Sequence, residues 1–195
     1  MNLNQWIKSQ QSKSEIEKIH ILSQNIISCS TDPLEVYFEY LVIRLIAGIN
    51  GFKNLEFGMK LDCDFKPISV APGGNADLIV TYTDVELVGE ATLRPISGKV
   101  DHFSHLDDTE KQIGMLFVQD IEKVDSQVWN TYKVHSNENG KLFMICDVKF
   151  LLKLLLDDQK TSNKKFLEFI KTSKDIWLTE NTWKNIRDRI IVLLK

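Results

Sequence analysis

The sequence predicts an α/β fold in which helices flank a mixed β-sheet. Short β-rich segments at 77–82, 85–93 and 142–146 alternate with longer segments of helical periodicity. Residues 113–118, Ile-Gly-Met-Leu-Phe-Val, are almost entirely apolar, as expected of a strand that is buried on both faces. Strands that alternate with helices after an initial hairpin are typical of a mixed sheet with helices packed on it.

Two helices are predicted before the first strand. Residues 14–28 carry isoleucine and leucine at three-to-four spacing, which indicates an amphipathic helix. A second helix is predicted over 34–49, with Asp32 as its N-cap and Pro33 at its first position. It is expected to end at Asn50-Gly51.

The other expected elements follow from the same criteria of periodicity and turn chemistry. In chain order they are short strands at 55–64, a loop at 71–75, a polar loop with a short helix at 94–112, a helix at 125–135, a turn at 136–140, a helix at 148–156, and one or two amphipathic helices up to Lys195 with Trp177, Trp183 and Ile186 facing inward.

Composition narrows the class of protein. A length of 195 residues is enough for one domain with a continuous core. The net charge of −3 argues against a generic electrostatic nucleic-acid binder, so DNA contact would need a local patch or a partner. No apolar run is long enough to span a bilayer, and the N-terminus lacks the apolar segment of a secretion signal. Cys29, Cys63 and Cys146 lack metal-site spacing and are expected to be reduced thiols in a cytosolic protein.

The predicted hairpin brings two acids together. A two-residue turn at Thr83-Asp84 would place Asp77 directly opposite Glu90, with Cβ atoms about 4.5–5.5 Å apart. Carboxylates this close repel each other, and a divalent cation such as Mg²⁺ offsets the repulsion. Strand alternation places Thr92 on the same face as the two acids. The alternative is that Asp77 caps the loop and Glu90 is a solvated strand residue.

A longer motif surrounds these acids. Residues 60–77 end in Ala-Pro-Gly-Gly-Asn-Ala-Asp and are followed by Glu90-Ala-Thr-Leu. This arrangement resembles the catalytic core of the AlwI/MlyI family, type IIS restriction endonucleases and nicking enzymes of the PD-(D/E)xK nuclease superfamily. The family pattern is Ala-Pro-Gly-Gly-x-Ala-Asp, a strand, then Glu-Val-Thr-Leu, and Ala91 replaces the valine here. Weaker similarity at 37–41 and 103–106 extends the resemblance over about 35–155.

The resemblance implies a restriction-endonuclease-like fold with one Mg²⁺ site. Asp77 and Glu90 would be the Mg²⁺ ligands, and Glu39 would be a helix-borne carboxylate that holds a water on the metal ion. The alternative for Glu39 is a helix-surface acid in a local network with Arg44 or Tyr40.

Positive charge at the site must come from a residue that the pattern does not specify. Thr92 stands where the superfamily has its lysine, and a hydroxyl carries no charge. Lys99, His105 and Lys111 are the local candidates. The family's Gly-Glu-Pro stretch has no counterpart in this sequence, and Asp101 is the candidate substitute for its glutamate.

The resemblance also implies the function: a Mg²⁺-dependent DNA endonuclease, cytoplasmic and bacterial, with one nuclease domain over 1–195. Its core would lie at about 35–155 and a C-terminal helical extension at about 156–195. The chain has no room for a separate DNA-recognition region, so it resembles the small cleavage subunit of heterodimeric type IIS enzymes. In those enzymes a larger partner recognises double-stranded DNA and cuts the other strand. Two alternatives stay open: a self-sufficient homodimeric nuclease, and a non-catalytic interaction protein on a nuclease-like scaffold.

Overall fold

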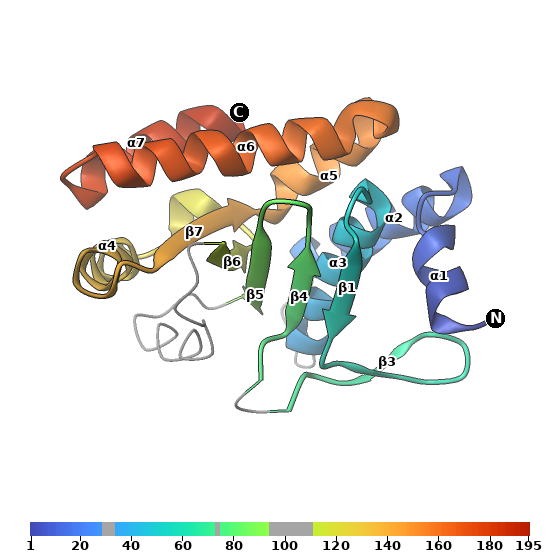
Figure 1. Cartoon of the computed structure of the whole chain (residues 1–195). Coiled ribbons are helices and arrows are strands. Elements are labelled where there is room, and N and C mark those ends of the chain that lie inside the picture. The colour runs from blue at the N-terminus through green and yellow to red at the C-terminus, as the bar shows by residue number, and fades with distance from the viewer. Residues whose placement is uncertain (29–33, 73–74, 94–110) are drawn as a thin grey trace.

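Helices and strands alternate along the chain in the computed structural model, which describes residues 1–28, 34–72, 75–93 and 111–195 (Figure 1). The helices are α1 (Leu3–Ser9), α2 (Lys13–Ser28), α3 (Leu34–Ile49), α4 (Ser126–Asn139), α5 (Val148–Asp157), α6 (Gln159–Thr179) and α7 (Trp183–Leu194), with a short 3₁₀ helix η2 (Ile121–Lys123). The strands are β1 (Asn54–Phe57), β2 (Lys60–Leu61), β3 (Pro67–Ser69), β4 (Leu78–Thr81), β5 (Glu86–Thr92), β6 (Gln112–Val118) and β7 (Leu142–Asp147).

A mixed sheet forms the centre of the described part of the chain, with strand order β1-β4-β5-β6-β7. β4 is antiparallel to both β1 and β5, whereas β5, β6 and β7 run parallel. Nearly every residue of β5 and β6 is buried, as a strand covered on both faces requires. The predicted α/β class, a mixed sheet flanked by helices, is therefore confirmed.

Helix α3 is deeply buried in the core. Every residue from 38 to 49 is buried. α3 packs against α2, α5, α6 and β5, so the helix that carries Glu39 is held from several sides. α6 extends along one side of the molecule with α7 beside it (Figure 1).

Several elements differ from the prediction. The turn expected at 136–140 is helical up to the end of α4, and Gly140 ends the helix in the left-handed conformation at φ 65°. α1, β3 and η2 were not predicted. α1 forms in a polar segment, where Asn2 and Gln5 make a capping box at its start and Trp6 and Ile7 are buried. Trp183, predicted to face inward, packs against the core but stays partly exposed.

Other predictions are confirmed or lie outside the described residues. α3 has the predicted bounds, and Trp177 and Ile186 are buried as expected. Cys63 and Cys146 are free thiols. The helix start at Asp32 and Pro33, Cys29 and the polar segment 94–110 fall outside the described ranges. No helix in those ranges is both long and apolar enough to cross a membrane.

Asp147 joins β7 to α5 and generates the first prediction. Its carboxylate accepts hydrogen bonds from the Lys149 N–H at 2.6 Å and from the Ile121 N–H at 2.9 Å, so it caps α5 and fixes η2. Asp147→Ala should lower the free energy of unfolding by about 2–3 kcal/mol, because the buried Ile121 N–H and the partly buried Lys149 N–H lose their acceptor. Urea unfolding measures the loss. Asp158→Ala removes the exposed N-cap of α6 and should have a smaller effect on the free energy of unfolding. Equal effects of the two substitutions would contradict the proposal that Asp147 also fixes η2.

Candidate functional site

The register of the β4–β5 hairpin brings the two predicted acids together. Leu78 pairs with Gly89, and the Tyr82 N–H donates to the Val85 carbonyl at 2.8 Å across the two-residue turn. One step beyond the Leu78–Gly89 pair, Asp77 lies opposite Glu90, as the sequence predicts. Counting from the hydrogen-bonded pair at the turn makes this a non-hydrogen-bonded position, where opposed Cα atoms approach to about 4.5 Å and side chains lie closest.

Both acids and Thr92 are buried. Their exposed fractions are 8% for Asp77, 2% for Glu90 and 1% for Thr92. The interpretation of Glu90 as a solvated strand residue is therefore wrong. Tyr132 of α4 shows what lies near Glu90: burial raises the pKa of Tyr132 well above its ordinary value, and the negative charge of Glu90 raises it further. Glu90 therefore lies in a low-dielectric part of the protein.

Asp77 is fixed by the two strands beside it. Its carbonyl accepts a hydrogen bond from the Gly58 N–H at 3.1 Å, just after β1. Its carboxylate Oδ2 accepts from the Ala91 N–H at 2.8 Å. The side chain therefore continues the β4–β5 ladder beyond its last main-chain pair and sets the direction of the carboxylate relative to Glu90.

Glu39 of α3 is connected to the same region. Its exposed fraction is 7%, and Oε2 accepts a hydrogen bond from the Ala71 N–H at 3.1 Å. Ala71 lies against Gly58, where an added Cβ would be 2.8 Å from the Ala71 Cβ. Glu39 is therefore linked through Ala71 and Gly58 to the backbone of Asp77, and the interpretation of Glu39 as a surface acid is wrong.

Of the remaining predicted site residues, the structure describes only Lys111. Lys99, Asp101 and His105 lie in the segment 94–110, outside the described residues. The carbonyl of Lys111 accepts from the Glu86 N–H, four residues before Glu90 along β5, or about 13 Å away. Lys111 is thus at the other end of the strand.

The donor chemistry fits a hard cation held by two carboxylates. Mg²⁺ takes oxygen ligands and often binds through only one or two carboxylates, retaining waters for the rest of its shell. Within 1–28, 34–72, 75–93 and 111–195, no group of three or more His, Cys, Asp or Glu side chains could hold a metal ion. The residues therefore suit a two-carboxylate site at Asp77 and Glu90, with Glu39 held apart by its bond to Ala71.

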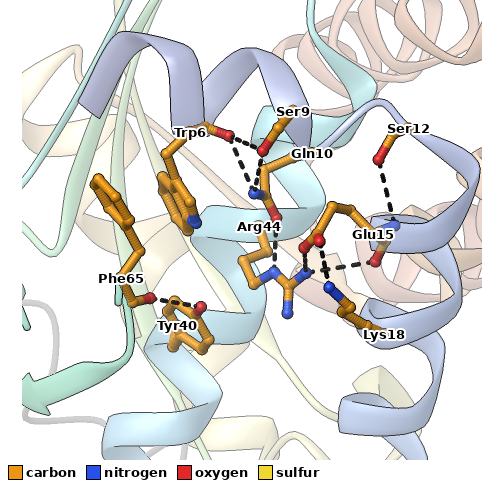
Figure 2. A network of polar contacts seen from close by, with 9 residues as sticks. All are labelled: Trp6, Ser9, Gln10, Ser12, Glu15, Lys18, Tyr40, Arg44 and Phe65. Atoms are coloured by element: carbon orange, nitrogen blue, oxygen red, sulfur yellow. Dashed lines mark hydrogen bonds and ion pairs between the residues drawn. The ribbon is translucent and has the colours of Figure 1, made fainter. Parts of the chain in front are cut away.

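A polar network centred on Arg44 braces α3 against the N-terminal helices (Figure 2). Arg44, which is 6% exposed, donates from Nε to Gln10 Oε1 at 2.7 Å and from Nη2 to Glu15 Oε2 at 2.6 Å. These bonds tie α3 to the segment after α1 and to α2. They also supply Arg44 with partners other than Glu39.

Aromatic packing extends this brace to the β2–β3 hairpin. Trp6 stacks against Tyr40 and Phe65, with ring centroids 6.1 and 5.6 Å apart. The Tyr40 hydroxyl donates to the Phe65 carbonyl at 2.7 Å (Figure 2). Since Tyr40 neighbours Glu39 and the hairpin leads to Ala71, α1 helps to position both ends of the Glu39–Ala71 bond. Sequence reasoning missed this role; the only signal was an apolar Trp6-Ile7 pair in a polar segment.

Comparison with known proteins agrees with the resemblance of the motif. Residues 1–102 match the profile of a family described as AlwI restriction endonuclease. The crystal structure of the small subunit of the heterodimeric restriction endonuclease R.BspD6I has a similar fold, with a TM-score of 0.69 at 16% sequence identity. The similarity covers 91% of this chain and 97% of that chain. A comparison with curated proteins finds no match.

The Arg44 network generates the second prediction. Arg44→Met should lower the free energy of unfolding by about 2–4 kcal/mol, because Gln10 and Glu15 lose a buried partner. Lys18→Met is the matched control: Lys18 contacts the same Glu15 carboxylate from an exposed position, so its loss should be below about 0.5 kcal/mol. Urea unfolding separates the two, and comparable losses would show that Arg44 is no brace.

Proposed function

The chain belongs to the AlwI restriction endonuclease family, and on that premise we propose that it is a Mg²⁺-dependent, type IIS DNA endonuclease subunit that hydrolyses one strand. The observation that carries the proposal is the hairpin register, which sets Asp77 opposite Glu90 within the matched segment and buries both acids. Two buried like charges destabilise a fold unless a cation or a proton compensates them. A divalent cation at this point would also activate the attacking water and neutralise charge on the phosphate, as phosphodiester hydrolysis requires.

Each residue has a proposed part in the reaction. Asp77 and Glu90 hold the metal ion, and the Ala91 N–H orients the Asp77 carboxylate toward it. When bound, Mg²⁺ would lower the pKa of the attacking water and neutralise charge on the phosphate. Glu39 is held by the Ala71 N–H, from which it can orient a water molecule toward the site.

Thr92 lies two residues beyond Glu90 on the same face of β5. Its hydroxyl can donate to a phosphate oxygen but brings no positive charge. We propose that this charge comes from Lys99 or His105, with Asp101 as an accessory acid, rather than from Lys111 at the far end of the strand.

A larger DNA-recognising partner completes the proposal. A chain with a net charge of −3 gains little of the electrostatic attraction that drives nonspecific DNA binding. The structurally similar R.BspD6I chain is the small subunit of a heterodimeric restriction endonuclease. We therefore propose one nuclease domain over 1–195, a core at about 35–155, a cytoplasmic bacterial setting, and a partner that selects the DNA site.

Neutral isosteres of the two acids test the metal site. Asp77→Asn and Glu90→Gln should each lower Mg²⁺-dependent cleavage by at least about 10²-fold, because the charges that hold the cation are lost. The melting temperature of each variant, measured without metal, checks that the fold is retained. Glu56→Gln, at an exposed position of β1, is the matched control and should remain active. Full activity of Glu90→Gln would instead favour a non-catalytic interaction protein.

The partner requirement gives a separate prediction. The purified chain should show little site-specific cleavage of plasmid DNA. The longer subunit alone should nick one strand, and the two subunits together should cut both strands. Glu90→Gln in this chain should return the mixture to nicking. Gel electrophoresis distinguishes nicked from linear DNA. Efficient cleavage by this chain alone would favour the self-sufficient homodimer.

A further inference from the structure

Tyr132 of α4 is a buried polar residue that the proposed reaction leaves without a role. Its exposed fraction is 0%. Solvent reaches neither the hydroxyl oxygen of Tyr132 nor Oε1 of Glu90. Polar groups that share a region without solvent act strongly on each other, because the low dielectric constant strengthens their electrostatic interaction. The position of Tyr132 relative to Glu90 therefore matters for the acid pair.

The register of the parallel strands places Tyr132 over the same face of the sheet as Glu90. Glu90 pairs with Leu116 of β6, which in turn pairs with Ile145 of β7. Paired residues of neighbouring strands point to one face, and Phe143, two residues before Ile145, points to that face as well. The ring of Tyr132 contacts the ring of Phe143, with centroids 5.5 Å apart. Tyr132 and Glu90 therefore extend into the same layer between the sheet and α4.

The charge of Glu90 reaches Tyr132. Burial is the larger cause of the raised pKa of Tyr132, and the negative charge of Glu90 is the second cause. Tyr82 is also buried, but it lies at the hairpin turn, about 17 Å along β5 from Glu90, and burial alone raises its pKa. Proximity to Glu90 thus distinguishes Tyr132 from the other buried tyrosine of this sheet. Its hydroxyl keeps the proton and can donate it to a carboxylate.

Contacts with α6 fix α4 at the position of Tyr132. Trp129, one turn earlier in α4, stacks on Trp177 of α6 with ring centroids 6.2 Å apart. Lys133, the residue after Tyr132, donates from Nζ to the Trp177 carbonyl at 2.9 Å. The hydroxyl is therefore held in place before any metal ion binds, as a group that orients a metal ligand must be.

On the premise that Asp77 and Glu90 hold the metal ion, as proposed above, we propose that Tyr132 is a positioning residue of the site. Its hydroxyl directs a hydrogen at the Glu90 carboxylate, stabilises the charged acid and holds it in the orientation that faces Asp77. The Ala91 N–H does the same for Asp77. Tyr132 acts through Glu90 and contacts neither the metal ion nor DNA.

Mn²⁺ binding to the purified chain tests this role. Tyr132→Phe removes the hydroxyl and keeps the ring, so it should weaken Mn²⁺ binding in calorimetry by at least about tenfold, as loss of a group behind a metal ligand does. Tyr82→Phe is the matched control: it removes a buried hydroxyl from the far end of the hairpin and should bind Mn²⁺ like the wild type.

Cleavage by the two subunits together gives a second measurement. Tyr132→Phe in this chain should raise the Mg²⁺ concentration that gives half-maximal cleavage of the strand that this chain cuts, and KM for DNA should stay unchanged. A tyrosine that only fills space would not shift the Mg²⁺ requirement, because phenylalanine fills the same space.

Urea unfolding without metal tests the interaction between Tyr132 and Glu90 directly. Tyr132→Phe should lower the urea midpoint of the wild type by more than it lowers the midpoint of Glu90→Gln, because the charged partner of the hydroxyl is already absent from that variant. Tyr82→Phe should shift both midpoints equally.

The outcomes separate this role from the proposed function. Additive effects of Tyr132→Phe and Glu90→Gln on the urea midpoint, or wild-type Mn²⁺ affinity in Tyr132→Phe, would overturn the positioning role alone. Absence of Mn²⁺ binding in the wild type would overturn the proposed metal site and this role with it. Loss of Mn²⁺ binding in Asp77→Asn with unchanged binding in Tyr132→Phe would keep the metal site and exclude Tyr132 from it.

Discussion

The antiparallel register of β4 and β5 is the constraint on which the site depends. With Leu78 opposite Gly89, Asp77 and Glu90 share one face, whereas a slip of one residue would move Glu90 and Thr92 to the other face. Thr-Asp is a weak hairpin turn by itself, so packing must hold the register. Gly89 contributes to this: an added Cβ would lie 2.7 Å from Leu78 Cδ2 and 2.9 Å from Phe117 Cε2, so the core closes only around a residue without a side chain.

The surrounding structure stabilises two buried acids whose charges would otherwise weaken the fold. The Ala91 N–H stabilises the Asp77 carboxylate, and the Gly58 N–H fixes the Asp77 backbone. On the other side of the site, α1 and α2 hold α3 through Arg44 and through the stacking of Trp6. These N-terminal helices lie within the segment that matches the family, which is consistent with a role in placing Glu39 rather than in simple extension of the core.

The sequence predicted what depends on local chemistry and alternation. The α3 bounds and the hairpin register follow from periodicity and a two-residue turn, and both are confirmed. Contacts between distant segments could not be predicted. The Glu39–Ala71 bond spans 32 residues, and α1 packs on the rest of the protein through the stacking of Trp6 on Phe65, far along the chain. The extension of α4 to Asn139 shows that a polar stretch can stay helical until a glycine ends it.

The most direct test of the acid pair is to locate a bound ion. Crystals of this protein soaked in Mn²⁺, a hard cation that takes carboxylate and water ligands and gives a strong anomalous signal, should show a peak between the Asp77 and Glu90 carboxylates. The peak should be absent from Asp77→Asn crystals of the same form. A Mn²⁺ peak elsewhere in the molecule, or an empty hairpin at saturating Mn²⁺, would contradict the proposal that these two acids hold the catalytic metal.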